Sequence, residues 1–202
     1  MTVYFTSDLH LGHTAVLAFA QRPWATIEEH DAAIIDNINA TVGHRDELYI
    51  LGDFTFRFMN DNVKPYLDAI RCHNRWLVLG NHDKAGYLRK PGAFKGVAPY
   101  MELREQGRLC VLSHYPMLDW NLAPVHHGVD PAKSSYMLHG HIHSQGRGYN
   151  GDCARNGIWR YNVGVDANGY KPVSFEEIDA FIKERSPLST GETRPCREKE
   201  RT

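Results

Sequence analysis

The chain has 202 residues, enough for one sizeable hydrophobic core and short for two independent domains. Its 42% apolar and 23% charged residues exclude a disordered or membrane-embedded chain and are typical of a globular domain. A formal net charge of -1 excludes an overall basic field that would attract nucleic acid, so any anionic ligand must be attracted locally.

Short apolar runs that each end in a polar cluster predict buried strands. They are Val3–Thr6, Leu48–Leu51, Trp76–Leu79, Leu109–Leu112, Tyr136–Leu138 and Trp159–Val163. Helices are expected over His13–Gln21 and Asn62–Cys72, and two more are expected to begin at Thr26 and at Ser174. Thr26 with Glu29, and Ser174 with Glu177, have the spacing of capping boxes. Strands and helices alternate at first, and strands dominate after Gly96. We therefore expect an α/β fold in which two mixed β-sheets pack as a sandwich flanked by helices.

One domain over residues 1–185 accounts for the periodic part of the chain. Residues 186–202 are rich in Ser, Thr, Pro, Glu, Arg and Lys without apolar periodicity, so we expect a disordered tail. The start lacks a basic and then apolar leader, and no stretch reaches the roughly 18 apolar residues of a membrane span. A cytoplasmic protein that does not contact membranes is therefore expected. The scattered Cys72, Cys110, Cys153 and Cys196 predict reduced thiols.

Residues that can bind metals follow five of the predicted strands, at the point where each strand ends. They are Asp8 and His10, then Asp53, then Asn81 with His82, then His114, and finally His141 with His143. Because loops beyond the carboxyl ends of strands form the binding crevice of α/β sheets, we expect these side chains to converge. Carboxylate, imidazole and amide ligands suit Mn²⁺, Fe, Zn²⁺, Co²⁺ or Ni²⁺. Such a set exceeds one coordination sphere, which favours two ions that share one carboxylate.

The ordered motifs resemble those of calcineurin-like metallophosphoesterases. The resemblance rests on Asp8-Leu9-His10, Gly52-Asp53, Gly80-Asn81-His82-Asp83, Ser113-His114 and Gly140-His141-Ile142-His143. Within this family, the chain most resembles small, cap-less bacterial and phage phosphoesterases. The segments Thr6–His13 and Asn162–Asp166 add to this resemblance.

The resemblance implies a binuclear centre of two divalent ions, with Mn²⁺ as the first expectation. It assigns Asp8, His10, Asp53 and His143 to one ion, and Asp53, Asn81, His114 and His141 to the other. Asp53 would bridge them. A hydroxide between the ions would attack phosphorus, while His82 would act as general acid toward the leaving group. His13 and Arg22 are candidates for contacting the substrate phosphate, and Asp83 is expected to orient or cap its turn.

The remaining histidines and the aromatic residues have other expectations. His30, His44 and His73 are expected on the surface outside the site, and His126 with His127 in a solvated loop. Aromatic side chains near the motifs can either stack a nucleobase or pack in the core. They are Phe54, Phe56, Phe58, Tyr115 and Trp120.

Departures from the family pattern narrow the function. No Asp-Arg-Gly follows Asp53, which argues against serine/threonine protein phosphatases, and Phe56 replaces the tyrosine of purple acid phosphatases. Little sequence remains after His143 for a cap, so we expect an open site.

The leading hypothesis is a phosphodiesterase for small or nucleotide diesters, cyclic nucleotides among them. A nuclease or a phosphomonoesterase is the enzymatic alternative, although only scattered residues such as Arg147, Arg155 and Arg160 would support a nucleic-acid groove. A non-catalytic binding scaffold that keeps the fold, like the retromer subunit that resembles this superfamily, is the alternative of another kind. The sequence leaves the oligomeric state open.

Overall fold

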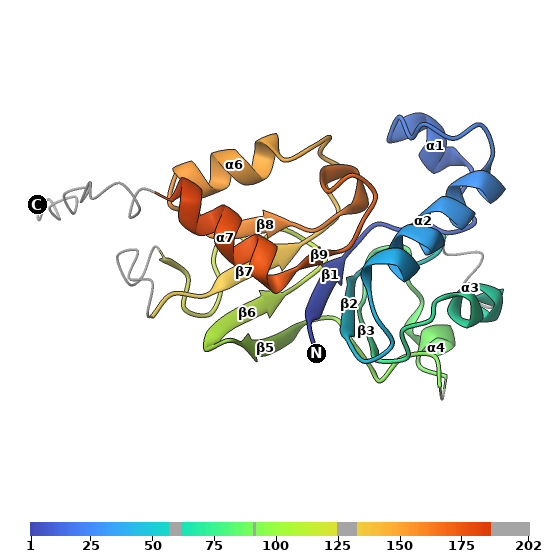
Figure 1. Cartoon of the computed structure of the whole chain (residues 1–202), viewed down its shortest axis with the longest axis horizontal. Coiled ribbons are helices and arrows are strands. Elements are labelled where there is room, and N and C mark those ends of the chain that lie inside the picture. The colour runs from blue at the N-terminus through green and yellow to red at the C-terminus, as the bar shows by residue number, and fades with distance from the viewer. Residues whose placement is uncertain (57–61, 91, 125–132, 187–202) are drawn as a thin grey trace, which may run out of the picture.

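The computed structural model describes residues 1–56, 62–90, 92–124 and 133–186 (Figure 1). The strands are β1 (Val3–Thr6), β2 (Glu47–Leu51), β3 (Arg75–Val78), β4 (Gly96–Ala98), β5 (Met101–Glu105), β6 (Arg108–Leu112), β7 (Tyr136–His139), β8 (Arg160–Asn162) and β9 (Val173–Ser174). The helices are α1 (Ala15–Phe19), α2 (Ile27–Thr41), α3 (Lys64–Ala69), α4 (Ala85–Leu88), α6 (Gly148–Arg155) and α7 (Phe175–Arg185), with a 3₁₀ turn η2 (Val165–Ala167).

The strands form two mixed sheets, as the sequence predicts. The first has the order β4-β3-β2-β1-β9, in which β1 to β4 are parallel and β9 is antiparallel to β1. The second has the order β5-β6-β7-β8, in which β6, β7 and β8 are parallel and β5 is antiparallel to β6. The parallel strands bring several chain segments to the same edge of the sandwich, and this positions the site.

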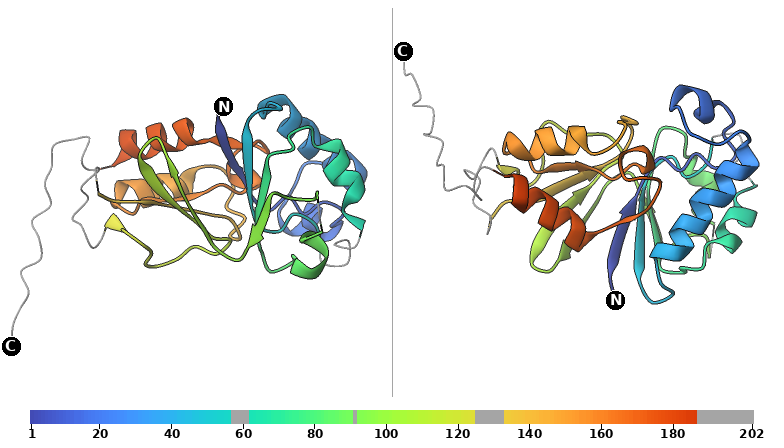
Figure 2. Two further views of the ribbon diagram at one scale, coloured as in Figure 1. Left: turned by 90° about the horizontal axis from the view of Figure 1, so that it is seen from below. Right: turned by 45° about the horizontal axis from the view of Figure 1, so that its top comes forward.

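The core lies between the two sheets and follows the period of two that strands impose. Phe5, Leu51 and Leu112 point into the space between the sheets and are fully buried. The alternate residues of the first sheet, such as Ile50, face outward onto α2 and α3. Helix α7 adds Ile178, Phe181 and Ile182 to the inter-sheet core. Figure 2 shows helices on the outer sides of both sheets.

Capping explains where the two longest helices begin. The Thr26 side chain accepts a hydrogen bond from the backbone N–H of Glu29, and Ser174 with Glu177 forms a complete capping box. Pro65 lies in the first turn of α3, where its missing N–H costs nothing. Within the described residues, no helix is long and apolar enough to span a lipid bilayer.

Two corrections concern the extent of elements. The expected helices at residues 13–21 and 62–72 are shorter, as α1 and α3 show. Helix α6 was not predicted, because Gly148 and Gly151 are poor helix formers and its sequence lacks an apolar stripe. Of the predicted tail, Ser186 is buried and its hydroxyl lies 3.2 Å from Trp159 Nε1; residues 187–202 lie outside the described residues.

The two sheets meet at the carboxyl ends of their parallel strands. Ser7 and Gly164 form a bridge between the chain after β1 and the chain after β8. The Asp8 N–H donates to the Gly52 carbonyl at 3.0 Å, and the Gly140 N–H donates to the His114 carbonyl at 3.0 Å. The turns that follow β1, β2, β6, β7 and β8 are therefore tied together around one point.

Candidate metal centre

The turns at this point hold their polar residues in left-handed backbone conformations. Asp8, His10, Asp53, His141 and His143 have φ of 59°, 52°, 52°, 72° and 44°. A side-chain-bearing residue pays on the order of 1 kcal/mol or more for such a conformation, and these conformations concentrate at functional sites. The fold therefore sustains local strain at five of the seven positions that the sequence nominates as ligands.

Two glycines let these turns approach closely. A Cβ at Gly140 would lie 1.9 Å from Ser7 Oγ and 2.4 Å from Asp8 Oδ2. A Cβ at Gly80 would lie 2.3 Å from Asp53 Oδ1. The glycines of the Gly-Asn-His-Asp and Gly-His-Ile-His motifs are thus required for space beside the carboxylates.

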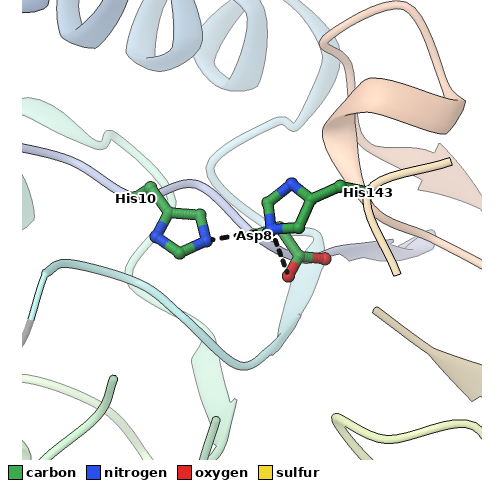
Figure 3. A group of neighbouring side chains, drawn as sticks. All are labelled: Asp8, His10 and His143. Atoms are coloured by element: carbon green, nitrogen blue, oxygen red, sulfur yellow. Dashed lines mark hydrogen bonds and ion pairs between the residues drawn. The ribbon is translucent and has the colours of Figure 1, made fainter. Parts of the chain in front are cut away.

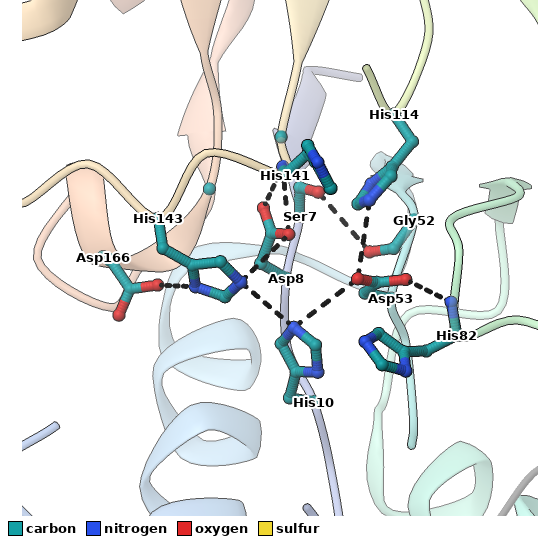
Figure 4. A network of polar contacts seen from close by, with 12 residues as sticks. Ser7, Asp8, His10, Gly52, Asp53, His82, His114, His141, His143 and Asp166 are labelled. Carbon is teal, nitrogen blue, oxygen red and sulfur yellow. Dashed lines mark hydrogen bonds and ion pairs between the residues drawn. The ribbon is translucent and has the colours of Figure 1, made fainter. Parts of the chain in front are cut away.

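Asp53 occupies the middle of the cluster (Figure 4). Its Oδ2 lies 3.5 Å from His10 Nε2 and 3.4 Å from His114 Nε2. Its Oδ1 accepts a hydrogen bond from the His82 backbone N–H at 2.9 Å, which fixes the carboxylate plane. The carboxylate therefore faces two groups of histidines at once.

The first group contains Asp8, His10 and His143 (Figure 3). Nε2 of His10 lies 3.2 Å from Nε2 of His143, which in turn lies 3.8 Å from Asp8 Oδ1. One ligand atom from each of the three residues falls within 4.8 Å of the others. This spacing is that of ligands around a common centre.

The second group contains Asn81, His114 and His141. Asn81 Oδ1 lies 2.9 Å from His114 Nε2 and 3.1 Å from His141 Nδ1. Asp8 links the groups, because both of its carboxylate oxygens accept from the His141 backbone N–H at 3.0 Å. All seven ligand candidates named from the sequence are thus brought together.

Hydrogen bonds behind the site fix the tautomers of two histidines. His114 Nδ1–H donates to the Leu51 carbonyl at 2.9 Å, because a carbonyl can only accept. His143 Nδ1–H donates to Asp166 Oδ2 at 2.8 Å. Both imidazoles therefore present the lone pair of Nε2 to the centre, which is the arrangement of metal-ligating histidines.

The protonation tendencies of the site fit a cation. Burial raises the pKa of Asp8, although His114 and His143 oppose that rise. Burial, together with the nearby cationic groups, holds the pKa of His10 well below its usual range. Burial is also the main cause that lowers the pKa of His141. Burial works against a rise in the pKa of His143, but the hydrogen bond to Asp166 and the charge of Asp8 raise it. The neutral imidazoles of His10 and His141 beside the buried Asp8 carboxylate are donors of the kind that bind a divalent metal.

Asp83 joins the Asn81-His82 turn to the Asp53 turn, as its predicted orienting role requires. Its carboxylate accepts from the backbone N–H groups of Gly80 (2.9 Å), Asp53 (2.8 Å) and Phe54 (3.1 Å). Burial raises the pKa of Asp83 to about 7. Asp83 thereby sets the distance between two of the ligand-bearing turns.

Arg22 corrects one expectation. Its side chain is buried, and its guanidinium contacts Asp166, the backbone carbonyls of Asp8 and Leu9, and His30 Nε2. These partners occupy it behind the site, so the expected contact with substrate phosphate does not fit this position. Arg22 instead holds the Asp8 turn and Asp166 in place.

His30 corrects a second expectation. It is fully buried rather than on the surface, and its ring joins Arg22 to Asp31 Oδ1 at 2.8 Å. His44 and His73 are exposed, as expected. His126, His127 and Phe58 lie outside the described residues.

Asp166 is the functional residue whose role the sequence reasoning missed. It lies in η2, follows β8 closely, and is the partner of both His143 and Arg22. Its position just after an apolar strand is a feature by which the sequence could have suggested a role at the site. Nothing in the sequence indicates, however, which histidine its carboxylate contacts.

His13 and His82 adjoin the first group. His13 is largely buried, its Nδ1 lies 3.1 Å from His10 Nδ1, and its ring stacks on Phe56 with centroids 4.0 Å apart. His13 therefore orients His10. A nitrogen of His82 lies within 4.8 Å of ligand atoms of His10 and Asp53, and His82 Nδ1 has no hydrogen-bond partner among the described residues.

Two exposed aromatic rings stand beside the centre. Phe19 is 54% exposed and meets His10 and His143 edge-on, at 6.1 and 5.3 Å between centroids. Tyr115 is 48% exposed and meets His141 at 4.6 Å. Phe54 and Trp120, by contrast, pack in hydrophobic clusters. Phe19 and Tyr115 are the aromatic surface open to a ligand.

Comparisons with known proteins place the chain among relatives of similar length. It is 26% identical over 200 residues to an uncharacterized protein of Methanocaldococcus jannaschii, covering 93% of this chain and 95% of that one. It is 29% identical over 172 residues to the gene 66 protein of Mycobacterium phage D29, covering 71% and 79%. No family model matches the chain.

Among solved structures, a protein of unknown function from Aquifex aeolicus superposes with a TM-score of 0.66 at 29% identity, covering 89% of this chain and 98% of that one. An archaeal phosphodiesterase superposes with a TM-score of 0.42 at 13% identity, covering 72% of this chain and 75% of that one. A phosphoesterase from E. coli also superposes with a TM-score of 0.42, at 15% identity, covering 83% of this chain and 80% of that one.

The fold and the arrangement of these turns agree with the resemblance found in the sequence. Two mixed sheets flanked by helices, with the ordered Asp, His and Asn motifs converging at their strand ends, are the arrangement that the resemblance to calcineurin-like metallophosphoesterases implies.

Proposed function

We propose that this protein is a metal-dependent phosphoesterase that hydrolyses small phosphodiesters, nucleotide diesters among them. One observation carries the proposal: Asp53 Oδ2 stands between His10 Nε2 at 3.5 Å and His114 Nε2 at 3.4 Å. A carboxylate oxygen that faces two separate histidine groups is suited to bridging two cations.

The residues present fit two divalent cations. Asp8, His10 and His143 would hold one, Asn81, His114 and His141 the other, and Asp53 both. Nitrogen and oxygen donors without thiolate suit Mn²⁺ and its neighbours in the first transition row. When bound, such ions supply Lewis-acid activation of water and of the phosphoryl oxygens.

His82 is the proposed general acid. Its backbone N–H is bound to Asp53, which fixes the start of its side chain beside the centre, and a nitrogen of its ring lies within 4.8 Å of ligand atoms of His10 and Asp53. An imidazole held in this way can donate a proton to the oxygen of the leaving group.

The surroundings favour a small substrate that contains a ring. Phe19 and Tyr115 are exposed beside opposite ligand groups, where a nucleobase can stack. Arg22 is committed to internal partners and adds no cation to the surface of the site. Both features support a nucleotide diester over a long polynucleotide.

A metal-by-substrate screen tests the proposal. Purified protein would be loaded with Mn²⁺, Zn²⁺, Co²⁺ or Ni²⁺ and given bis-p-nitrophenyl phosphate, p-nitrophenyl phosphate, cyclic nucleotides, and single- and double-stranded DNA. We expect metal-dependent turnover of the diesters above the monoester, abolished in Asp53→Asn. Turnover of none of them at full metal content would support the scaffold alternative instead. Activity on DNA that falls steeply with salt would support the nuclease.

A further inference from the structure

A second pocket is lined by residues of β5, β6 and α7. These elements lie in the half of the molecule away from α1 and α2 (Figure 1). The pocket has a volume of about 510 Å³, and its walls come from the β5–β6 turn, the start of β6, the residues before β7, and α7. Leu109 of β6 lines it, whereas His114 of the metal centre follows five residues later, just after β6 ends. A strand rises about 3.3 Å per residue, so the two sites are separated by roughly 16 Å.

Cationic side chains dominate the charge of this pocket. Arg104, Arg108, Lys133 and Lys183 line it, against a single carboxylate from Asp179. Asp179 is already engaged, because it accepts from Lys183 Nζ at 2.6 Å and from the Tyr136 hydroxyl at 2.7 Å. Arg104 is exposed and makes no ion pair with any residue in the described part of the chain. A chain of net charge -1 has thus gathered an excess of positive charge around one cavity.

A buried hydroxyl in the same pocket lacks a partner. Ser134 is only 3% exposed, and its Oγ has no hydrogen bond to any of the described residues. Its backbone carbonyl accepts from Arg108 Nη1 at 2.6 Å, which holds the serine beside the guanidinium. Buried hydroxyls are normally satisfied, so Ser134 Oγ is a hydrogen-bonding group that remains for a ligand of the pocket.

The guanidinium of Arg108 is held in a fixed position. It lies over the rings of Tyr136 and Trp159, at 4.7 and 5.3 Å from their centroids. These contacts, with the bond to Ser134, leave it little freedom. A preorganised guanidinium beside a hydroxyl donor is suited to a tetrahedral oxyanion.

We propose that this pocket binds a small molecule that carries a phosphate group. The charge excess favours a dianion over a single carboxylate, and Arg108 with Ser134 supplies donors for its oxygens. Leu109, Leu122 and Phe175 form an apolar wall for the organic part of the ligand. The volume exceeds what inorganic phosphate alone would fill. Binding here is separate from the reaction proposed at the metal centre.

Inorganic phosphate and phenyl phosphate are the probes for the test. Each would be titrated into the full-length, ¹⁵N-labelled protein in EDTA, so that metal ions do not retain phosphate at the other site. The readout is the amide chemical shifts of Gly107, Ser134 and Lys183, with the amides of Asp8 and Asp53 observed in parallel. We expect saturable shifts at the pocket amides, and tighter binding of phenyl phosphate because of the apolar wall.

Two variants and one control make the test specific. Arg104→Glu should weaken binding about tenfold, because an arginine–phosphate contact is charge-assisted. Ser134→Ala should weaken binding about fivefold without lowering the midpoint of unfolding, because the hydroxyl it removes is unsatisfied in the free protein. Arg89→Glu changes the net charge equally on an exposed residue beside α4 and should bind like the wild type.

The proposal is overturned by shifts at the pocket amides that grow linearly without saturation, or by their absence. Equal affinities in Arg104→Glu and Arg89→Glu would also overturn it, because binding would then follow only the overall charge. A Ser134→Ala variant that bound phosphate as tightly as the wild type would show that the hydroxyl does not contact the ligand, and it would likewise overturn the proposal.

Discussion

Arg22 and Asp166, which are 144 residues apart in the sequence, form a two-point ion pair behind the metal centre. Arg22 Nε and Nη2 each lie 3.0 Å from a different oxygen of the carboxylate. Burial alone would raise the pKa of Asp166, but hydrogen bonds from His143 and Arg22 hold it below its ordinary value. The pair ties the end of β8 to the turn after β1, and it fixes His143 from behind.

Asp166→Asn tests this positioning role. The amide keeps the size of the side chain but removes the charge that orients His143, and loss of such a partner typically weakens metal binding about 10–100-fold. Calorimetric titration of the metal-free protein with Mn²⁺ measures the effect. Asp152→Asn is the control, because Asp152 pairs with Arg155 on the exposed surface at 2.5 Å. Unchanged affinity in Asp166→Asn would show that His143 needs no support.

His82→Ala should keep the metal ions and the fold yet lose activity, since a positioned acid contributes about 10²- to 10⁴-fold. The loss should be large for a substrate that releases an alkoxide, such as a cyclic nucleotide. It should be small for a nitrophenyl ester, whose leaving group needs little protonation. Equal losses on both would indicate stabilisation of phosphoryl charge instead. Loss of bound metal would make His82 a ligand, as its closeness to His10 and Asp53 also allows.

Phe19→Ala and Tyr115→Ala test the aromatic surface beside the centre. Both rings are about half exposed, so their loss should leave stability nearly unchanged. If they stack a base, KM for a nucleotide diester should rise about fivefold or more, since stacking contributes about 1–3 kcal/mol per base. KM for a diester without a ring should not change. Leu118→Ala, at a side chain 94% exposed, is the control. Equal changes on both substrates would exclude stacking.

His139 predicts an acid-sensitive fold. It is fully buried, and burial foremost lowers its pKa to about 3. In the unfolded chain its pKa is about 6.5, so as the pH falls below that value only the unfolded state takes up the proton. Stability should therefore fall between about pH 6.5 and 3, by up to about 1.4 kcal/mol per pH unit.

His139→Leu isolates this effect from other titrating groups. Urea unfolding of metal-free protein should show that the wild type loses about 2 kcal/mol more than the variant between about pH 7.5 and 5. Parallel losses in the two proteins would mean that His139 is protonated without cost in the folded state.

Much of the site was predictable because its ligands follow buried strands. The apolar runs ending before Asp8, Asp53, Asn81 and His114 mark both the strands and the crevice at their ends. The two-sheet architecture followed from the same runs. An apolar run and the ligand residue that follows it are adjacent in the chain, so both can be recognised from one sequence.

What the sequence could not predict depends on long-range contacts. The sequence suggests a substrate contact for Arg22, a surface position for His30 and no role for Asp166, whereas folding places all three in one buried network. Edge strands such as β9, with two residues, have too little pattern to be recognised. Helix α6 contains two glycines, and packing against β8 and α7 overrides their low propensity.

The central claim is that Asp53 joins two cations, and crystallography of the Mn²⁺-saturated protein tests it most directly. Anomalous scattering at the manganese edge should show two peaks, about 3.5–4 Å apart, with Asp53 Oδ2 bound to both. One peak should lie among Asp8, His10 and His143, and the other among Asn81, His114 and His141. A single peak at saturating Mn²⁺, or two peaks with Asp53 bound to neither or to only one of them, would contradict the account.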